Sequence, residues 1–203
     1  MPDIHITYIN GPDIERLAIT DQEILDAIES SLGAQGRGSC VIEPRMHLAP
    51  KAGVDGHFNV LRGAIGAPID LAGVKVVGDF VDNYKQDLPS EVGVLTLFDP
   101  RTGIPVAILD ATAITDMRTG AVTAIGAKYL ARKGSRVLGH IGARGTAYWN
   151  VRLLDRLFDF DEIRVHSARP ESRQAFGERL SRDLGKPVLV CDNWHDTVAG
   201  ADI

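Results

Sequence analysis

The stretch that decides the fold is Arg136-Val-Leu-Gly-His-Ile-Gly-Ala-Arg-Gly-Thr-Ala147. It predicts a buried strand that turns through glycines into a helix. In such a unit the backbone N–H groups at the start of the helix bind the pyrophosphate of a dinucleotide. Glycine at the turn lets the phosphate approach where a side chain would block it. The alternative is a glycine-rich turn between a strand and a helix that binds nothing.

The pattern Gly-x-Gly-x-x-Gly/Ala fits this stretch in one register. That register assigns the cofactor-binding positions to Gly142, Ala143, Arg144, Gly145, Thr146 and Ala147. Arg144 therefore stands where the pattern has its second glycine. Either its guanidinium adds a cation near the phosphates, or its bulk crowds the pyrophosphate and weakens binding, and the sequence leaves both open.

The residues that follow continue to alternate between strand and helix patterns. They predict a strand at Glu162–Ser167, a helix at Pro170–Leu184, a strand at Pro187–Cys191, a short helix at Trp194–Ala199 and the opening of a fourth strand at Ala201–Ile203. A dinucleotide-binding domain of this type has two βαβαβ halves, so the sequence supplies the first half. We expect the functional protein to be longer, or a second chain to complete the sheet.

Residues 1–116 have a different pattern, typical of an α+β domain. A capping box at Thr20–Glu23 predicts the start of a helix. Strands are predicted at Val54–Leu61, Gly73–Phe80, Val92–Asp99 and Ile104–Leu109, with the last two forming a hairpin. A helix predicted at Asp116–Arg132 joins this region to the nucleotide-binding region without a linker.

Composition and charge narrow the class of protein. The chain of 203 residues is 44% apolar and has a net charge of −5, and no apolar run approaches the ~20 residues of a membrane span. Without a basic cluster or a secretory signal, we expect a cytoplasmic protein with small-molecule ligands, not nucleic acid or membrane. Cys40 and Cys191 stand beside apolar residues, which is typical of buried free thiols. No cluster has the spacing of metal ligands, so no metal site is predicted.

Five motifs carry a resemblance to a known family. They are Glu43-Pro-Arg-Met-His47, Gly73-Val-Lys-Val-Val77, Asn83 with Leu88-Pro89, Thr102-Gly-Ile-Pro105 and Ile114-Thr-Asp-Met-Arg-Thr-Gly-Ala121. In their order and spacing, the chain resembles the ornithine cyclodeaminase/mu-crystallin family from about residue 40 to its end. That family includes cyclodeaminases, alanine dehydrogenases, imine and ketimine reductases, and a crystallin that binds NADPH and thyroid hormone.

The resemblance implies a domain organisation. A substrate-binding and dimerisation domain is expected at residues 1–116, a connecting helix at 117–132, and a Rossmann NAD(P)-binding domain, incomplete at its C-terminus, at 133–203. The expected fold class is thus α/β, with an α+β domain followed by the first half of a Rossmann domain. The family's dimer forms through the first domain, so we expect a homodimer.

Three cations next to apolar residues suit the carboxylate of a 2-amino or 2-imino acid. By the resemblance, Arg45 and Arg118 bind this carboxylate, and Lys75 lies near the reacting carbon and its nitrogen. Because valines flank Lys75, we expect partial desolvation to lower its pKa, so that it exchanges protons near neutral pH. The alternative is a lysine of an edge strand that extends to water.

Arg118 is expected to begin a helix, where the helix dipole disfavours a cation unless an anion is bound. The alternative is an ion pair with Asp116 or Asp110. By the resemblance, the neighbouring Thr119 contacts a cofactor phosphate.

Asn83 is a candidate on the substrate or nicotinamide side, although an asparagine in a loop usually just makes a turn. His47 and His57 could titrate near neutral pH. A lone histidine is more often structural, and the family pattern calls for neither.

The end of the second strand of the nucleotide-binding region indicates the cofactor. NAD enzymes commonly have an acidic residue there that binds the ribose 2′-OH. The run Val165-His-Ser-Ala-Arg-Pro170 has no acidic residue before Glu171, whereas Ser167 and Arg169 can bind a 2′-phosphate. We therefore expect NADP(H) in preference to NAD(H).

Together these residues predict an NAD(P)-dependent oxidoreductase that acts on the Cα–N bond of a small amino or imino acid. Reduction of an imine or ketimine is the first choice, because a pocket of the NADP type favours the reductive direction. Two alternatives remain open: an ammonia-eliminating cyclisation of the ornithine cyclodeaminase type, and a mu-crystallin-like protein that binds NADPH and a small ligand without turnover. The carboxylate that cyclisation requires lies, in the family, beyond Ile203.

Overall fold

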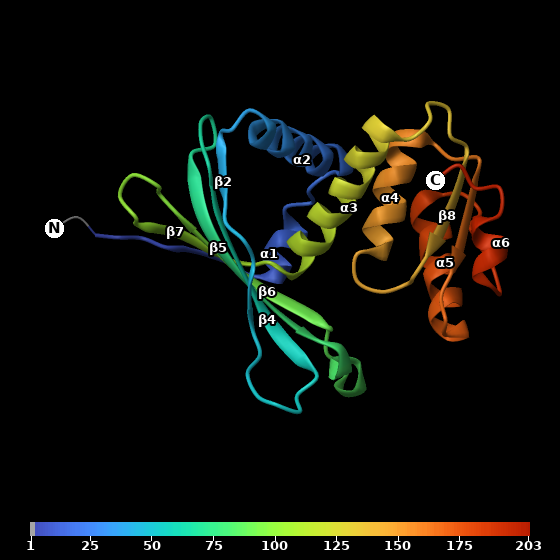
Figure 1. Cartoon of the computed structure of the whole chain (residues 1–203), viewed down its shortest axis with the longest axis horizontal. Helices are drawn as coiled ribbons and strands as arrows, with labels where there is room; N and C mark the ends of the chain where they lie inside the picture. Colours follow the sequence, from blue (N-terminus) through green and yellow to red (C-terminus); the bar gives the residue numbers. More distant parts are fainter. Residues whose placement is uncertain (1–2) are drawn as a thin grey trace. The chain divides into compact units, whose positions relative to one another are not determined.

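The computed structural model describes residues 3–203 and divides the chain into two compact units (Figure 1). The first unit runs to Thr20 and continues at Glu29–Thr115, and the second consists of Asp21–Ile28 and Asp116–Ile203. Each unit combines helices with a sheet, so the expected α/β class is confirmed.

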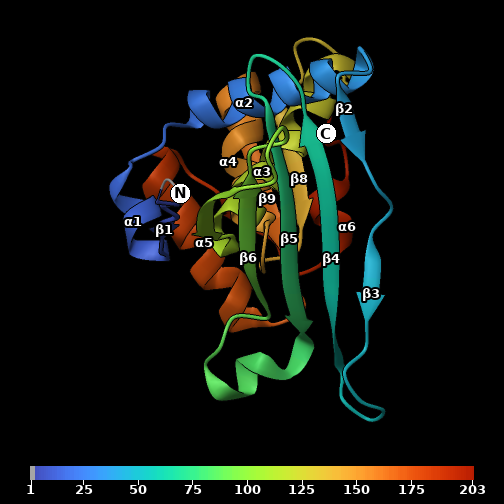
Figure 2. The ribbon, with the colours of Figure 1, turned by 90° about the vertical axis from the view of Figure 1, so that its left-hand side faces the viewer.

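The first unit is built on a seven-stranded mixed sheet, whose long strands lie side by side in Figure 2. The strand order is β1 (Thr7–Ile9), β7 (Pro105–Asp110), β6 (Glu91–Phe98), β5 (Leu71–Phe80), β4 (Gly56–Ile65) and β2 (Cys40–Ile42), and β3 (Met46–Leu48) also pairs with β4. Only β1 and β7 run parallel. The four expected strands are β4 to β7, and the expected hairpin is the antiparallel β6–β7 pair.

Helices and turns complete the first unit at α1 (Gly11–Arg16), part of α2 (Asp21–Gly36), the 3-10 turn η1 (Val81–Gln86) and the start of α3 (Thr112–Leu130). The helix expected from Asp116 thus begins four residues earlier. The cause is a local cap, since the Asp110 carboxylate accepts a hydrogen bond from the Thr112 N–H at 2.8 Å. The Gly93 carbonyl accepts the preceding N–H, that of Ala111, at 2.8 Å.

The two faces of this sheet differ in exposure. Directly paired residues of neighbouring strands point to the same face, and alternate residues point to opposite faces. The register places Val76 and its neighbours on one face and Lys75 and Val77 on the other. Val77 is 6% exposed, whereas Val76 is 39% exposed. The Val76 face also carries the exposed side chains of Tyr8, Val41, Met46, Leu48, Val92 and Val94.

The second unit is built on a parallel sheet in the order β10 (Leu189–Val190), β9 (Glu162–His166) and β8 (Val137–Ile141). Besides the first half of α2 and most of α3, its helices are α4 (Ala147–Phe158), α5 (Pro170–Leu184) and α6 (Trp194–Val198), and Figure 1 shows α4 and α6 on either side of β8. The helix predicted at 170–184 is confirmed in full. Residues Leu138, Ile163, Val165 and Leu180 are at most 1% exposed and form the core.

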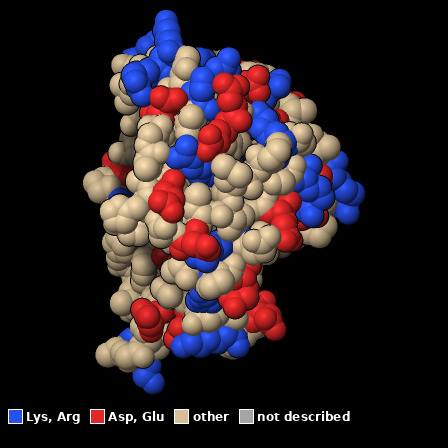
Figure 3. All heavy atoms as spheres, turned by 90° about the vertical axis from the view of Figure 1, so that its right-hand side faces the viewer, with Lys and Arg blue, Asp and Glu red and all other residues tan. Residues whose placement is uncertain are grey.

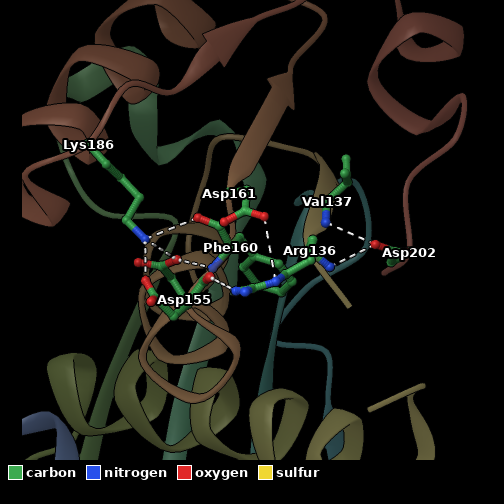
Figure 4. Close-up of polar contacts among 8 residues, drawn as sticks. Arg136, Val137, Asp155, Phe160, Asp161, Lys186 and Asp202 are labelled. Atoms are coloured by element: carbon green, nitrogen blue, oxygen red, sulfur yellow. Dashed lines mark hydrogen bonds and ion pairs between the residues drawn. The ribbon is translucent and has the colours of Figure 1, made fainter. Parts of the chain in front are cut away.

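The expected fourth strand lies along the free edge of β8. Ile203 donates to the Val137 carbonyl at 3.3 Å and accepts from the Gly139 N–H at 2.9 Å, the two bonds of a parallel ladder around Leu138. The Asp202 carboxylate accepts the N–H groups of Arg136 at 2.7 Å and Val137 at 3.0 Å, as Figure 4 shows. These bonds hold the pKa of Asp202 below its ordinary value. The assigned sheet has three strands, and the backbone bonds of Ile203 extend it at the edge of β8 where a Rossmann sheet has its fourth strand.

A polar cluster around the buried Asp155 ties the end of α4 to the following loop. The Lys186 ammonium donates to Asp155 Oδ1 at 3.0 Å, Asp159 Oδ1 at 2.9 Å and the Phe160 carbonyl at 3.2 Å (Figure 4). Asp155, which is 8% exposed, also accepts the Phe160 N–H at 3.1 Å. A charge buried this deeply needs such a full set of partners, so the cluster fixes the entry into β9.

The outer surface is of mixed charge. On the face shown in Figure 3, basic and acidic side chains are interspersed rather than separated by sign. Within residues 3–203, no helix combines the length and the apolar character of a membrane span. Cys40 and Cys191 are free and half-buried rather than buried, and they belong to different units.

Two glycines of α3 lie in contrasting environments. A Cβ added at Gly120 would meet the backbone carbonyl carbon of Trp149 in α4 at 2.5 Å, whereas at Gly126 it would meet no atom of the described residues within 4 Å. Gly120 therefore lets the two helices approach closely, and Gly126 has no such packing role.

Alanine at these two positions is expected to change stability in opposite directions. Gly120→Ala forces α3 and α4 apart and should lower the free energy of unfolding by about 1–3 kcal/mol. Gly126→Ala removes backbone freedom from the unfolded chain and should raise it by about 0.5–1 kcal/mol. Urea denaturation followed by circular dichroism measures both, and equal effects of the two substitutions would contradict the packing described for Gly120.

Candidate functional site

Lys75 lies in the middle of β5 and is half-buried. Its Nζ donates to Thr115 Oγ1 at 3.1 Å, and the Thr115 hydroxyl in turn donates to the Ala111 carbonyl at 2.6 Å. Thr115 lies in the first turn of α3 and is 6% exposed, so a buried hydroxyl positions the ammonium. Because β5 lies between β4 and β6, the alternative of an edge-strand lysine is wrong.

Arg45 comes into the same row of side chains as Lys75. Leu61 on β4 is paired with Lys75 on β5, and the β3–β4 register, continued by one residue beyond Met46, places Arg45 opposite Leu61. The two cations thus share one face of the sheet, two strand spacings or roughly 10 Å apart. Arg45 is exposed. We call this surface, with the row Arg45–Leu61–Lys75 at its centre, the Lys75 face.

Arg118 does not begin a helix. It is the seventh residue of α3, in the second turn, so the argument from the helix dipole was wrong. Its side chain is exposed. Asp110, one of the two expected ion-pair partners, instead caps α3 through the Thr112 N–H.

Thr119 lies close to the start of α4. The next residue, Gly120, packs against the backbone of Trp149 in the first turn of α4. The Thr119 carbonyl accepts the Thr123 hydroxyl at 3.2 Å. The structure therefore brings Thr119 to the helix that follows the glycine-rich stretch, although the sequence separates the two by more than twenty residues.

Asn83 lies in η1 and is half-buried. Its Nδ2 donates to the Pro89 backbone carbonyl at 2.8 Å, and the Asn83 backbone carbonyl accepts the Leu88 N–H at 3.1 Å. The Nδ2 bond of Asn83 thus closes the loop between β5 and β6, as expected for a turn asparagine. Its expected role toward substrate remains a prediction.

The glycine turn, defined as Gly142–Ala147, connects β8 to α4. Gly142 has φ +114° and donates to the His166 carbonyl at 2.8 Å, and Gly145 has φ +51°. A Cβ at either glycine would meet no atom of the described residues within 4 Å. Ala143 and Arg144 lie between them, and the Arg144 side chain is exposed.

The start of α4 has no side-chain cap. Thr146 is its N-cap, yet the Thr146 side chain makes no capping hydrogen bond, and Ala147 follows as the first helical residue, 4% exposed. Orphan N–H groups at the start of a helix attract a phosphate. Together with the open space at Gly142 and Gly145, this fits the pyrophosphate of a nicotinamide nucleotide.

The ends of all three parallel strands are held together. Gly142, after β8, is bonded to His166 at the end of β9, and His166 Nδ1 donates to the Cys191 carbonyl after β10 at 3.0 Å. Ser167, the next residue, is half-buried, and Arg169 is the exposed N-cap of α5. The structure therefore places the Ser167–Arg169 loop beside the glycine turn, at the carboxyl edge where ligands bind in such sheets.

Two residues of the site escaped the sequence-based prediction. Thr115 stands in the Ile114–Ala121 motif, but nothing local showed that it would meet Lys75 forty residues away. Arg173 reaches from α5 to the Asp192 carboxylate at 2.7 Å and to the Ser167 carbonyl at 3.5 Å, which fixes the Ser167 loop.

In residues 3–203, no group of three or more His, Cys, Asp or Glu side chains could hold a metal ion.

His140 lies in β8, two residues before Gly142, and is half-buried with its ring 6.1 Å from that of Phe176. Its Nδ1 is buried and has no hydrogen-bond partner in residues 3–203. Burial lowers the pKa of His140 below its ordinary value of 6.5, and the nearby Gly142 backbone opposes this only in part. The ring is therefore neutral at physiological pH and supports the strand that leads into the glycine turn.

Comparison with known proteins finds similarity across residues of both units. The family model described as "Ornithine cyclodeaminase/mu-crystallin family" matches residues 10–203. Alanine dehydrogenase of Archaeoglobus fulgidus is 34% identical over 164 residues, 81% of this chain and 49% of the relative.

Two solved structures have the same fold. The Δ1-pyrroline-2-carboxylate reductase of Thermococcus litoralis, in complex with NADH and L-proline, matches 97% of this chain and 60% of its own, with a TM-score of 0.92 and 27% identity. An archaeal alanine dehydrogenase dimer with bound NAD matches 92% of this chain and 56% of its own, with a TM-score of 0.83 and 30% identity. The chain thus spans 49–60% of the length of these relatives.

The half-buried His140 should make the fold sensitive to acid. In the unfolded chain the imidazole takes up a proton near pH 6.5, whereas in the folded protein it does so only at lower pH. Its contribution is therefore fully present above pH 6.5 and is lost as the pH falls through the window below that value. His140→Gln should flatten the dependence of the free energy of unfolding on pH between 6.5 and 5, measured by urea denaturation.

The exposed His5 provides the matched control. His5→Gln should leave the pH dependence as in the wild type. An unchanged slope in His140→Gln would show that the ring is not held neutral by burial.

Proposed function

Because the chain belongs to the ornithine cyclodeaminase/mu-crystallin family, we propose that the protein is an NAD(P)-dependent oxidoreductase acting on the Cα–N bond of a small amino or imino acid. The reaction is that of an imine or ketimine reductase or of an amino-acid dehydrogenase. The observation that carries the proposal is the Lys75 face, where Arg45 and Lys75 share one row of side chains and Thr115 holds the lysine ammonium. A cation for the carboxylate and a proton donor for the nitrogen are the two groups that this reaction requires.

The substrate half of the site belongs to residues of three elements. We assign the carboxylate to Arg45 and Arg118, with Asn83 as a further substrate-binding residue. Lys75 donates a proton to the substrate nitrogen as the carbon is reduced, and takes it back in the reverse direction. Thr115 is a positioning residue, because its hydroxyl acts only through Nζ of Lys75.

The cofactor half belongs to the second unit. A nicotinamide nucleotide, when bound, supplies or accepts the hydride. Its phosphates would lie at the glycine turn, near Thr119, where positive φ angles and open space at Gly142 and Gly145 fit them. Ser167 and Arg169 would hold a 2′-phosphate, which favours NADP(H) over NAD(H). The two solved relatives contain NADH and NAD, so this preference rests on the residues of this chain alone.

We further propose that residues 1–116 form the substrate-binding and dimerisation domain, that 117–132 connect it, and that 133–203 form the nucleotide-binding domain. The Val76 face is the candidate dimer surface, because its exposed apolar side chains run across several strands of the sheet. An exposed apolar surface of this extent is typical of an interface. One solved relative is a dimer.

The nucleotide preference is tested by titration with NADPH and NADH, followed by nicotinamide fluorescence. Arg169→Asp removes the cation proposed for the 2′-phosphate and should weaken NADPH binding about 10- to 100-fold, with NADH changed less than about threefold. Arg182→Asp, an exposed arginine of the same helix, is the matched control. Equal losses for both nucleotides would refute the 2′-phosphate assignment, and failure of both to bind the wild type would refute the cofactor proposal itself.

Turnover tests the role of Lys75. With NADPH and a panel of imino acids, Lys75→Met should lower kcat about 10²- to 10⁴-fold and leave NADPH binding intact. Thr115→Val should lower kcat less and shift the pH profile, since the hydroxyl only positions the ammonium. The surface variant Lys85→Met controls for loss of charge. Full activity of Lys75→Met would exclude the lysine as the proton donor.

The dimer surface is tested by charge insertion. The double variant Val76→Asp, Val94→Asp places carboxylates at adjacent strands of the Val76 face and should convert dimer to monomer in light scattering after size exclusion. Leu130→Asp, at a side chain 88% exposed on α3, should leave the dimer intact. A double variant that remains dimeric would show that the dimer forms through a surface other than the Val76 face.

A further inference from the structure

A largely buried arginine lies beside the loop to which we assign the 2′-phosphate of the nucleotide. Arg173, near the start of α5, has a side chain that is only 14% exposed. Its Nη1 donates to the Ser167 carbonyl at 3.5 Å and to the Asp192 carbonyl at 3.2 Å, and its Nη2 donates to Asp192 Oδ1 at 2.7 Å. One guanidinium thus joins the Ser167–Arg169 loop after β9 to the loop after β10.

The register of the parallel sheet independently brings Asp192 to this loop. Val190 of β10 is paired with Val165 of β9, and the Cys191 N–H continues the pairing with a bond to the Val165 carbonyl at 2.9 Å. Two residues beyond Val190, the same register places Asp192 opposite Ser167. Because neighbouring strands lie about 5 Å apart, Asp192 stands at the carboxyl edge next to the Ser167–Arg169 loop.

The two members of this ion pair differ sharply in exposure. The Asp192 side chain is 91% exposed, whereas the guanidinium with which it pairs belongs to a side chain that is 14% exposed. A cation buried to this extent requires partners that match its charge. The Asp192 carboxylate provides the opposite charge from the solvent side, so the pair carries no net charge at the carboxyl edge.

A phosphate bound on the Ser167–Arg169 loop would lie close to both charges. The Ser167 carbonyl and the Asp192 carboxylate contact two nitrogens of the same guanidinium, so they lie within about 9 Å of each other. At 0.1 M salt, charges interact over about 10 Å. A phosphate monoester carries a charge of about −1.5 to −2 at neutral pH. Arg173 therefore attracts such a phosphate, and Asp192 repels it.

We infer that Arg173 and Asp192 are a specificity-determining pair for the 2′-phosphate of the nucleotide. Asp192 neutralises the cation beside the loop and thereby limits the preference for NADP(H) that Ser167 and Arg169 supply. NAD(H) has a hydroxyl in place of this phosphate, so the pair affects it little. The inference rests on the proposed function, because it requires a nicotinamide nucleotide at the carboxyl edge of the second unit.

Titration with NADPH and NADH, followed by nicotinamide fluorescence, tests the pair. Asp192→Asn keeps the size of the side chain and removes its charge, so NADPH should bind about tenfold more tightly, with NADH changed less than about threefold. Arg173→Met removes the cation and leaves the carboxylate, so NADPH should bind about tenfold more weakly. An ion pair with only a structural role would instead give losses for both variants and both nucleotides.

An arginine–aspartate pair at the opposite edge of the same sheet is the matched control. Arg136 Nε lies 3.5 Å from Asp161 Oδ2, and these residues immediately precede β8 and β9. Asp161→Asn and Arg136→Met should leave the ratio of the two dissociation constants unchanged. Circular dichroism checks that each variant is folded.

Salt provides a second readout. Because Asp192 is exposed, raising the salt concentration to about 0.5 M should reduce the gain in NADPH affinity of Asp192→Asn. A gain that came from altered packing would persist at high salt and would contradict the electrostatic role.

The inference is overturned if Asp192→Asn leaves NADPH binding unchanged or weakens it, if the folded Arg173→Met binds NADPH as tightly as the wild type, or if the affinities for both nucleotides change equally. Failure of the wild type to bind either nucleotide would refute the proposed function and, with it, the role of the pair. The two failures are distinguishable, because in the first the wild type still binds a nucleotide.

Discussion

The alternation of side chains along β4 and β5 is the constraint on which the first unit depends. These strands form ten consecutive antiparallel pairs, from Gly56 with Phe80 to Ile65 with Leu71. Because the side-chain period of a strand is two residues, a slip by one residue would move Lys75 to the Val76 face and Val76 to the Lys75 face. The proposed substrate side and the proposed dimer side are therefore set by the same register.

In the second unit, the constraint is the backbone geometry of the glycine turn. The bond from the Gly142 N–H to the His166 carbonyl joins the glycine turn to the end of the neighbouring strand, and it requires a φ of +114°, which a side chain would strain. Arg144 can replace the second glycine of the common pattern because its side chain is exposed. The turn is thus formed by two glycines and a loop held from β9, and the three-glycine pattern is only one way to reach it.

The sequence predicted those features that depend on neighbours in the chain. Helix α5 was predicted in full because Pro170 at its first turn and the spacing of Phe176 and Leu180 are local signals, and the structure adds Gly185 as a left-handed C-cap. The start of α3 was missed because Asp110, which caps it, also reads as the last residue of a strand. The contact of Thr115 with Lys75 and the ion pair of Arg173 with Asp192 arise from sheet register and helix packing, which no periodicity reveals. Among the expected site residues, Arg45 and Lys75 are brought together on one face, whereas their roles remain proposals.

Asp202 has a consequence for the order in which the second unit forms. Its carboxylate binds the N–H groups of Arg136 and Val137, residues that precede it by 66 and 65 positions. On the ribosome, the strand that leads into the glycine turn is therefore made long before the segment that covers its second edge. Until Asp202 has left the exit tunnel, that edge of β8 presents unpaired backbone groups and is open to pairing with other strands. The glycine turn is thus synthesised well before the segment that pairs with the second edge of the strand leading into it.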